Sequence, residues 1–122
     1  KELAYIHAEG YAAGEMKHGV NALLGSEMAT IVCAPKNELH AKMLSNISEV
    51  KARGGEVTAI ATEGDDSVGR LADRVIYVPD CPVLLQPFMT LVPLQILAYR
   101  AALALGRDPD KPRNLAKTVT VE

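Results

Sequence analysis

Three side chains capable of acid–base or covalent chemistry lie near the two ends of this 122-residue chain. Lys117 is a single cation between the apolar Leu115 and Ala116 and an alternating Thr-Val-Thr-Val end. Protein tails fray unless they are tied down, so this composition indicates a tail that docks. A docked tail can place the Lys117 amine over a pocket, where a desolvated lysine forms imines with carbonyl substrates. Glu2 and His18 are of the types that move protons.

Each of these residues also has a simpler structural interpretation, which by itself is the more common one. A lysine in a tail, such as Lys117, is ordinarily solvated. Glu2 at the start of a helix complements the positive end of the helix dipole, and His18 at a helix end complements the negative end. Of the other histidines, His7 is expected to hydrogen-bond from mid-helix within an interface, and His40 is expected to be solvated.

The rest of the sequence alternates short apolar runs with longer amphipathic stretches. Asn37 is placed to cap the helix that follows it, and Gly54-Gly55 is placed to end that helix. Gly10 and Gly14 weaken the first helix unless its backbone packs closely against a neighbour. The pattern predicts helices over 2–17, 37–53 and 83–105, strands over 29–34, 56–62 and 74–78, and a short helical turn over 67–72.

Strands that alternate with helices indicate right-handed crossovers and a parallel sheet with helices on both faces. The predicted fold is therefore a three-layer, doubly wound α/β domain. With 122 residues and 48% hydrophobic content, the chain can bury one core, so we expect one domain.

Composition and charge exclude several classes of protein. A formal net charge of −2 gives no basic surface for nucleic acid. No apolar stretch runs uninterrupted to membrane-spanning length, so no membrane association is expected. Cys33 and Cys81 fit neither a metal site nor a disulfide framework, and reduced thiols indicate a cytoplasmic protein. Gly54-Gly55 lacks the pattern of a phosphate-binding loop. We expect neither a metal nor a cofactor.

Segments 1–19 and 112–122 closely resemble the C-terminal part of the glucosamine-6-phosphate synthase family. The tail is the most specific part, because its Ala-Lys-Thr-Val-Thr-Val-Glu ending goes beyond the similar Pro-Arg-x-Leu-x-Lys ending of related sugar-phosphate deaminases. Further landmarks of the likeness are the tripeptides Ser45-Asn46-Ile47, Arg53-Gly54-Gly55 and Pro93-Leu94-Gln95.

The resemblance implies a flavodoxin-like sugar isomerase (SIS) domain, a fold that usually has five strands. Because only about three strands are predicted, residues 1–106 are expected to form part of the second SIS domain of a longer protein. The missing strand or two would precede Lys1. Residues 107–122 are expected to form an extended tail that completes the active site. The family's first SIS domain, which holds the sugar phosphate, and its glutaminase domain are expected in the parent chain.

The family converts fructose 6-phosphate and glutamine-derived ammonia to glucosamine 6-phosphate, and the resemblance implies roles for particular residues. Glu2 matches the glutamate that moves a proton between C1 and C2, and His18 matches the histidine that opens the sugar ring. Lys117, with Ala116 beside it in the substrate-binding tail, matches the lysine that engages the open-chain sugar. The family usually has proline after its His-Gly pair, whereas Val20 stands here, so His18 is expected to be held less rigidly.

The spacing of Glu2 and His18 adds a geometric argument. On one helix, sixteen residues at about 1.5 Å each separate them by roughly 24 Å, which one hexose phosphate cannot span. Both can act on one sugar only if one comes from a second subunit. We therefore expect a homodimer with a shared active site, as the family is known to have.

Two other functions fit parts of the pattern. An SIS-type glucosamine-6-phosphate deaminase runs related chemistry toward fructose 6-phosphate and ammonia, and a glutaminase domain in the parent chain would separate the two enzymes. A noncatalytic SIS module that senses a sugar phosphate requires neither a proton shuttle nor an imine, so Glu2 and Lys117 argue against it.

Overall fold

The computed structural model of the chain describes residues 1–114. These residues belong to two compact units. One unit is Gly10–Pro93, and the other combines Lys1–Glu9 with Leu94–Glu122, of which the part up to Asn114 is described. Ala116 and Lys117, two of the predicted site residues, lie outside the described part.

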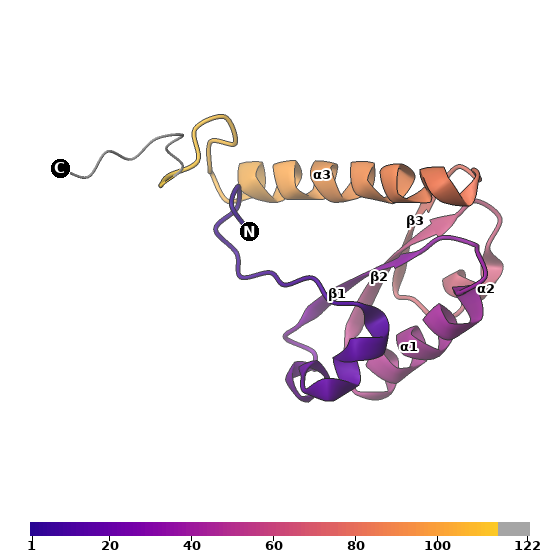
Figure 1. The fold of residues 1–122 in the computed structure, drawn as a ribbon. Helices are drawn as coiled ribbons and strands as arrows, with labels where there is room; N and C mark the ends of the chain where they lie inside the picture. The colour runs from indigo at the N-terminus through magenta and orange to yellow at the C-terminus, as the bar shows by residue number, and fades with distance from the viewer. Residues whose placement is uncertain (115–122) are drawn as a thin grey trace. The chain divides into compact units, whose positions relative to one another are not determined.

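A parallel sheet of three strands organises the unit Gly10–Pro93 (Figure 1). The strands β1 (Ala29–Ala34), β2 (Glu56–Thr62) and β3 (Arg74–Val78) lie in that order, and each covers the range predicted for it. Central strand β2 is buried along most of its length, and its buried apolar residues are Val57, Ala59, Ile60 and Ala61. The prediction of a parallel α/β fold is confirmed.

Helix α1 (His40–Ala52) lies against one face of this sheet (Figure 1). Ile47 and Val50 are its fully buried residues, and they share a core with β2 and with Val68. The helix ends as predicted: Gly54 takes a φ of 77°, and the Gly55 amide donates back to the Val50 carbonyl. Residues of this core are Ala34, Ile47, Val50, Val57, Ala59, Ala61 and Val68.

Asn37 does not cap α1 in the predicted way. The helix begins three residues later, at His40, and the Asn37 side-chain oxygen accepts a hydrogen bond from the Leu39 amide at 2.9 Å. The side-chain amide donates instead to Gln86 Oε1 at 2.8 Å. Asn37 therefore makes an Asx turn ahead of the helix and a tertiary contact, and the cap prediction was wrong.

The predicted helix over 2–17 is also wrong. Glu2 lies in a turn closed by the Tyr5 amide and the Lys1 carbonyl, residues 6–12 have no regular structure, and only Ala13–His18 (η1) coils, as a 3-10 helix. Glycine costs an α-helix about 1 kcal/mol relative to alanine, and two glycines fall within the predicted helix, at 10 and 14. Residues 6–12 are exposed, so no packing offsets that cost. A second 3-10 turn follows at Val20–Leu23 (η2).

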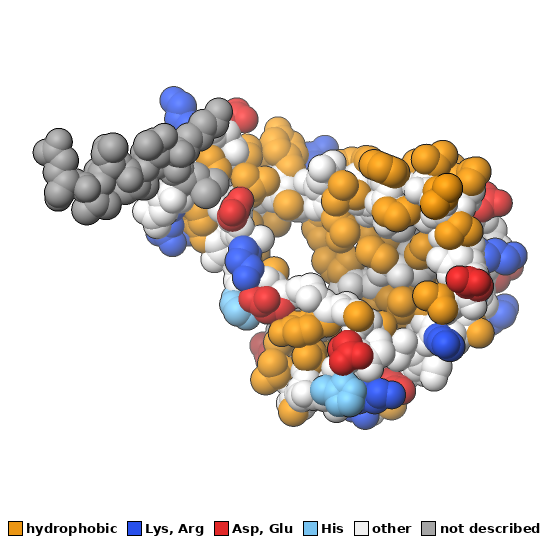
Figure 2. Space-filling view, in the orientation of Figure 1, with side chains coloured by type: hydrophobic (Ala, Val, Ile, Leu, Met, Phe, Trp, Pro, Cys, Tyr) orange, Lys and Arg blue, Asp and Glu red, His pale blue; other side chains and the backbone are white. Residues whose placement is uncertain are grey.

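The C-terminal helix agrees with its predicted range. A 3-10 turn at Val83–Leu85 (η3) leads into α3 (Gln86–Ala104), which contains Pro93. The short α2 (Asp66–Gly69) was predicted near 67–72. Many hydrophobic side chains of α3 are exposed, and Figure 2 shows them gathered on its surface.

Taken together, η3 and α3 form a long and largely apolar segment. Val83–Ala104 is long and apolar enough to cross a membrane by length and composition. A stretch of 18 residues within it has a mean hydropathy of 1.3, and 11% of that stretch is buried. The segment is interrupted by polar residues such as Gln86, Gln95 and Arg100, so the expectation that no apolar stretch reaches this length uninterrupted is not contradicted. One such helix is weak support for a membrane span, because core helices of soluble proteins pass the same test.

Candidate functional site

The carboxylate predicted to move protons, Glu2, is exposed in the turn at the start of the chain. The Tyr5 amide donates to the Lys1 carbonyl at 2.9 Å and closes that turn. Lys1 Nζ also lies 2.7 Å from Glu9 Oε1, and this ion pair holds the pKa of Glu9 below its usual value. Glu2 is thus positioned by a local turn, not by a helix.

The predicted ring-opening residue, His18, ends η1 with its side chain 67% exposed. Its Nε2 lies 3.9 Å from Glu15 Oε2, an exposed pair across one turn. Val20 stands where the family resembled by the sequence usually has proline. It follows His18 by two residues and begins η2. His18 therefore stands on the surface of the unit Gly10–Pro93.

These placements remove the geometric argument for a shared site. Glu2 and His18 belong to different compact units and are not joined by one helix, so the separation of roughly 24 Å calculated from a helical rise does not apply. Glu2 and His18 thus belong to separate units of the described residues, and Lys117 lies outside those residues. The homodimer with a shared active site remains a prediction that rests on the family resemblance.

A cluster around Tyr5 connects the start of the chain with the base of the C-terminal tail. The Arg113 amide donates to the Tyr5 hydroxyl at 2.7 Å. The guanidinium groups of Arg113 and Arg107 lie 4.3 and 5.1 Å from the centre of the Tyr5 ring. Sequence reasoning missed this cluster, because its members are about a hundred residues apart and no local pattern connects them.

A second polar cluster lies at the carboxyl ends of β1 and β2, the end of the strands at which doubly wound sheets bind ligands. The buried Thr62 hydroxyl accepts from the Lys36 amide at 2.9 Å. Gln86, 5% exposed, donates to the Lys36 carbonyl and accepts from Asn37. These bonds join the start of α3 to the loop after β1. The side chains satisfy one another, so the cluster holds the loop in place and does not present free groups to a ligand.

His40 and Asp65 extend this network. Their side chains are 15% and 5% exposed, and His40 Nε2 lies 2.5 Å from Asp65 Oδ2. The expectation of a solvated His40 was therefore wrong. The other carboxylate oxygen of Asp65 accepts from the hydroxyl of Ser67 and from the amides of Ser67 and Val68, which caps α2.

The charge of Asp65 is stabilised by hydrogen bonds from these partners. Burial alone raises the pKa of the Asp65 carboxyl, but hydrogen bonds from Ser67, His40 and the Val68 amide outweigh it and hold the pKa below its ordinary value. The carboxylate form is thus the stable one in the folded protein, and the pair connects α1 to the loop after β2.

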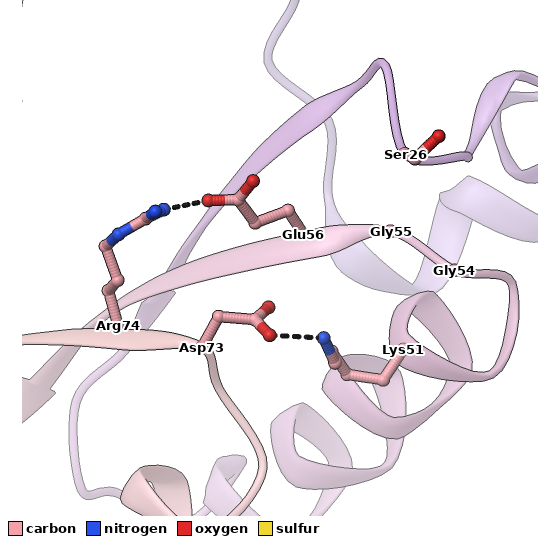
Figure 3. A pocket seen from close by; sticks show the side chains of 7 residues that line it. All are labelled: Ser26, Lys51, Gly54, Gly55, Glu56, Asp73 and Arg74. Carbon is pink, nitrogen blue, oxygen red and sulfur yellow. Dashed lines mark hydrogen bonds and ion pairs between the residues drawn. The ribbon is translucent and has the colours of Figure 1, made fainter.

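A cavity of about 370 Å³ opens at the opposite end of the strands, where β2 and β3 begin (Figure 3). Lys51 and Asp73 pair across it at 2.5 Å, and this contact holds the pKa of Asp73 below its usual value. Arg74 and Glu56 form a second ion pair at its wall. Because each charge has a partner of opposite sign, the cavity offers no net attraction to a sugar phosphate.

Neither a metal site nor a disulfide is present in the described part of the chain. Within residues 1–114, no group of three or more His, Cys, Asp or Glu side chains is arranged to hold a metal ion. Cys33 and Cys81 are both free. Burial raises the pKa of the Cys33 thiol, against the opposing effect of a hydrogen bond with Thr90, so this thiol is a weak nucleophile.

Comparisons with known proteins identify relatives over the whole chain. The SIS domain family model matches residues 1–105. The chain is 61% identical to glutamine–fructose-6-phosphate aminotransferase [isomerizing] of Thermus thermophilus and 54% identical to that of Bacteroides thetaiotaomicron. Both alignments cover 100% of this chain and 20% of the relative, so the chain spans about a fifth of their length.

A solved structure shows the same fold. The C-terminal domain of glucosamine-fructose-6-phosphate aminotransferase from Francisella tularensis superimposes with a TM-score of 0.80 at 37% sequence identity. The superposition covers 89% of this chain and 31% of that one. The parallel sheet described above is thus the SIS type of α/β fold.

Proposed function

This chain belongs to the SIS domain family, and we propose that it forms the isomerase part of a glutamine–fructose-6-phosphate aminotransferase. The observation that carries the proposal is the 61% identity to the Thermus thermophilus enzyme over all 122 residues, tail included. A shared fold alone would not suffice, because one fold hosts many functions. An alignment that runs through the predicted site residues and the tail favours one reaction among those that the fold supports.

The proposed reaction attaches ammonia from glutamine to C2 of fructose 6-phosphate. The Lys117 amine condenses with the C2 carbonyl of the open-chain sugar, which forms an imine and releases water, and ammonia then displaces the lysine. Glu2 takes a proton from C1 and returns it to C2, leaving an aldehyde at C1 and an amino group at C2. His18 exchanges the proton that ring opening requires, and Ala116 contributes to binding of the sugar.

The proposal includes partners that complete the site. A second subunit supplies His18 to the site that contains Glu2, and the glutaminase and first SIS domains of the parent chain supply ammonia and the phosphate site. Support comes from the family relationship of the whole chain. We also propose a cytoplasmic location, which the free Cys33 and Cys81 support.

The test replaces Lys117 by arginine in the intact protein, which keeps the positive charge but removes a nucleophilic amine. Glucosamine 6-phosphate formation should fall by about 100-fold or more, the scale on which a positioned catalytic group acts. Glutamine hydrolysis should survive, and borohydride should trap a sugar adduct on the wild-type tail only. Lys111→Arg, an exposed lysine of the same tail, is the matched control.

Two results would contradict the proposal. If Lys117→Arg does not differ from Lys111→Arg and no adduct is trapped on the wild type, Lys117 only docks the tail. If the intact wild-type protein instead consumes glucosamine 6-phosphate without any dependence on glutamine, the enzyme is a deaminase.

A further inference from the structure

Tyr5 has an unusual backbone conformation, and it contacts Arg113 near the other end of the chain. Its φ is 57°, in the left-handed region that bulky residues rarely occupy. Such strain persists only where surrounding contacts maintain it, and it is concentrated at functional sites. The contacts here are the Arg113 amide on the Tyr5 hydroxyl and the guanidinium groups of Arg107 and Arg113 near the ring.

The loop that reaches Tyr5 is built by local geometry from the end of α3. Gly106 takes a φ of 65°, and the Arg107 amide donates back to the Ala102 carbonyl at 2.9 Å, which ends the helix and sets the direction of Arg107. The Asp108 side chain then accepts from the Asp110 amide at 2.9 Å and turns the chain again. Arg113 follows this turn and contacts Tyr5.

Each of the two segments that this contact joins carries a predicted catalytic residue. Glu2 is three residues from Tyr5, and Lys117 is four residues from Arg113. A fully extended chain spans at most about 3.6 Å per residue, so the α-carbons lie within about 11 Å in the first case and about 14 Å in the second. Fixing Arg113 on Tyr5 therefore starts the sequence that leads to Lys117 from a point on the segment that carries Glu2.

We infer that Tyr5 is a positioning residue that anchors the base of the C-terminal tail beside Glu2, and that it acts on the reaction through Lys117. The hydroxyl fixes the main chain at Arg113, and the ring binds both guanidinium groups through cation–π contacts. The catalytic part of this inference rests on the proposed function, whereas the anchoring part does not.

The experiment uses Tyr5→Leu, Tyr5→Phe and the control Tyr11→Leu in the intact protein. Tyr11 is an exposed tyrosine of the same N-terminal stretch. Tyr5→Leu should lower kcat by about tenfold or more, because small displacements of a positioned group are costly, with KM for fructose 6-phosphate changed less than about threefold. Tyr5→Phe keeps the ring and should show a smaller loss. Tyr11→Leu should match the wild type.

Two further measurements separate positioning from general structural damage. In the Lys117→Arg background, Tyr5→Leu should lower kcat by less than about twofold, because residues that act through one another are not additive. Hydrogen exchange at the Arg113 amide should accelerate about tenfold in Tyr5→Leu, in line with the loss of its hydrogen bond, and stay unchanged in Tyr11→Leu.

Three outcomes would contradict the inference about Tyr5. Equal kcat for Tyr5→Leu and Tyr11→Leu, a full multiplicative loss in the Lys117→Arg background, or unchanged exchange at Arg113 would overturn it. If Tyr5→Leu also loses glutamine hydrolysis and is misfolded, Tyr5→Phe decides by the same kcat and exchange criteria. If the wild type makes no glucosamine 6-phosphate, the proposed function fails, and exchange at Arg113 alone decides whether Tyr5 anchors the tail.

Discussion

Replacing Asp65 by alanine tests how the network at the carboxyl edge of the sheet holds α1 and α2. The change removes the cap of α2, which costs about 1 kcal/mol. It also leaves the largely buried His40 ring without its acceptor, which costs about 1–3 kcal/mol. The local free energy of opening should therefore fall by about 2–4 kcal/mol, which corresponds to a factor of roughly 30 to 1,000 in the opening equilibrium.

Amide hydrogen exchange in the intact protein measures this effect locally, because it reports opening of single elements. The amides of Ser67 and Val68 donate to Asp65 in the folded protein, so their exchange should accelerate by that factor. Asp66→Ala is the matched control: Asp66 is the exposed neighbour on the same helix, and only its interaction with the helix dipole, about 0.3–1 kcal/mol, is lost.

The same pair predicts a dependence on pH. Because the folded pKa of Asp65 is lowered, its contribution to stability is fully present above the unfolded value near 3.8 and is lost as pH falls through the folded pKa. The difference between wild type and Asp65→Ala, corrected for intrinsic exchange, should shrink below about pH 4. Equal effects of Asp65→Ala and Asp66→Ala near neutrality would refute the reasoning.

Two further predictions concern packing and assembly. Gly55→Ala should destabilise the protein by about 1–3 kcal/mol through overpacking, because an added Cβ would lie 2.6 Å from Val50 Cγ1. Gly25→Ala, where a Cβ meets nothing within 4 Å, is the control, and equal thermal midpoints would contradict the packing argument. Mixing inactive Glu2→Gln and His18→Ala proteins should restore part of the synthase activity if two subunits share a site. No recovery after verified subunit exchange would count against a shared site.

The strands and most helix ends followed from local sequence. Strands β1, β2 and β3 are short runs rich in apolar residues, and the limits of these runs agree with the structure. The helix stop at Gly54-Gly55 was equally local, because a left-handed φ after a helix favours glycine. Family membership was also visible in the sequence, through the termini that resemble the synthases.

The first helix and the capping of α1 were decided by tertiary structure. Residues 2–17 have the composition of a helix, but helical stability in proteins comes mainly from packing, and residues 6–12 are exposed. Asn37 has the chemistry of a cap, yet its side-chain amide bonds Gln86, forty-nine residues away. In the first case the packing that a helix needs is missing, and in the second a distant residue binds the side chain. Neither can be seen in the local sequence.

The candidate site divides in the same way. Glu2, His18 and Lys117 were identified by residue type and family resemblance, and their roles remain predictions. The pairing of His40 with Asp65 and the contact of Tyr5 with Arg113 join residues 25 and 108 positions apart. The sequence specified which groups can donate and accept hydrogen bonds, but only folding determined which of them meet, because distant partners are chosen by the path of the backbone and not by spacing along the chain.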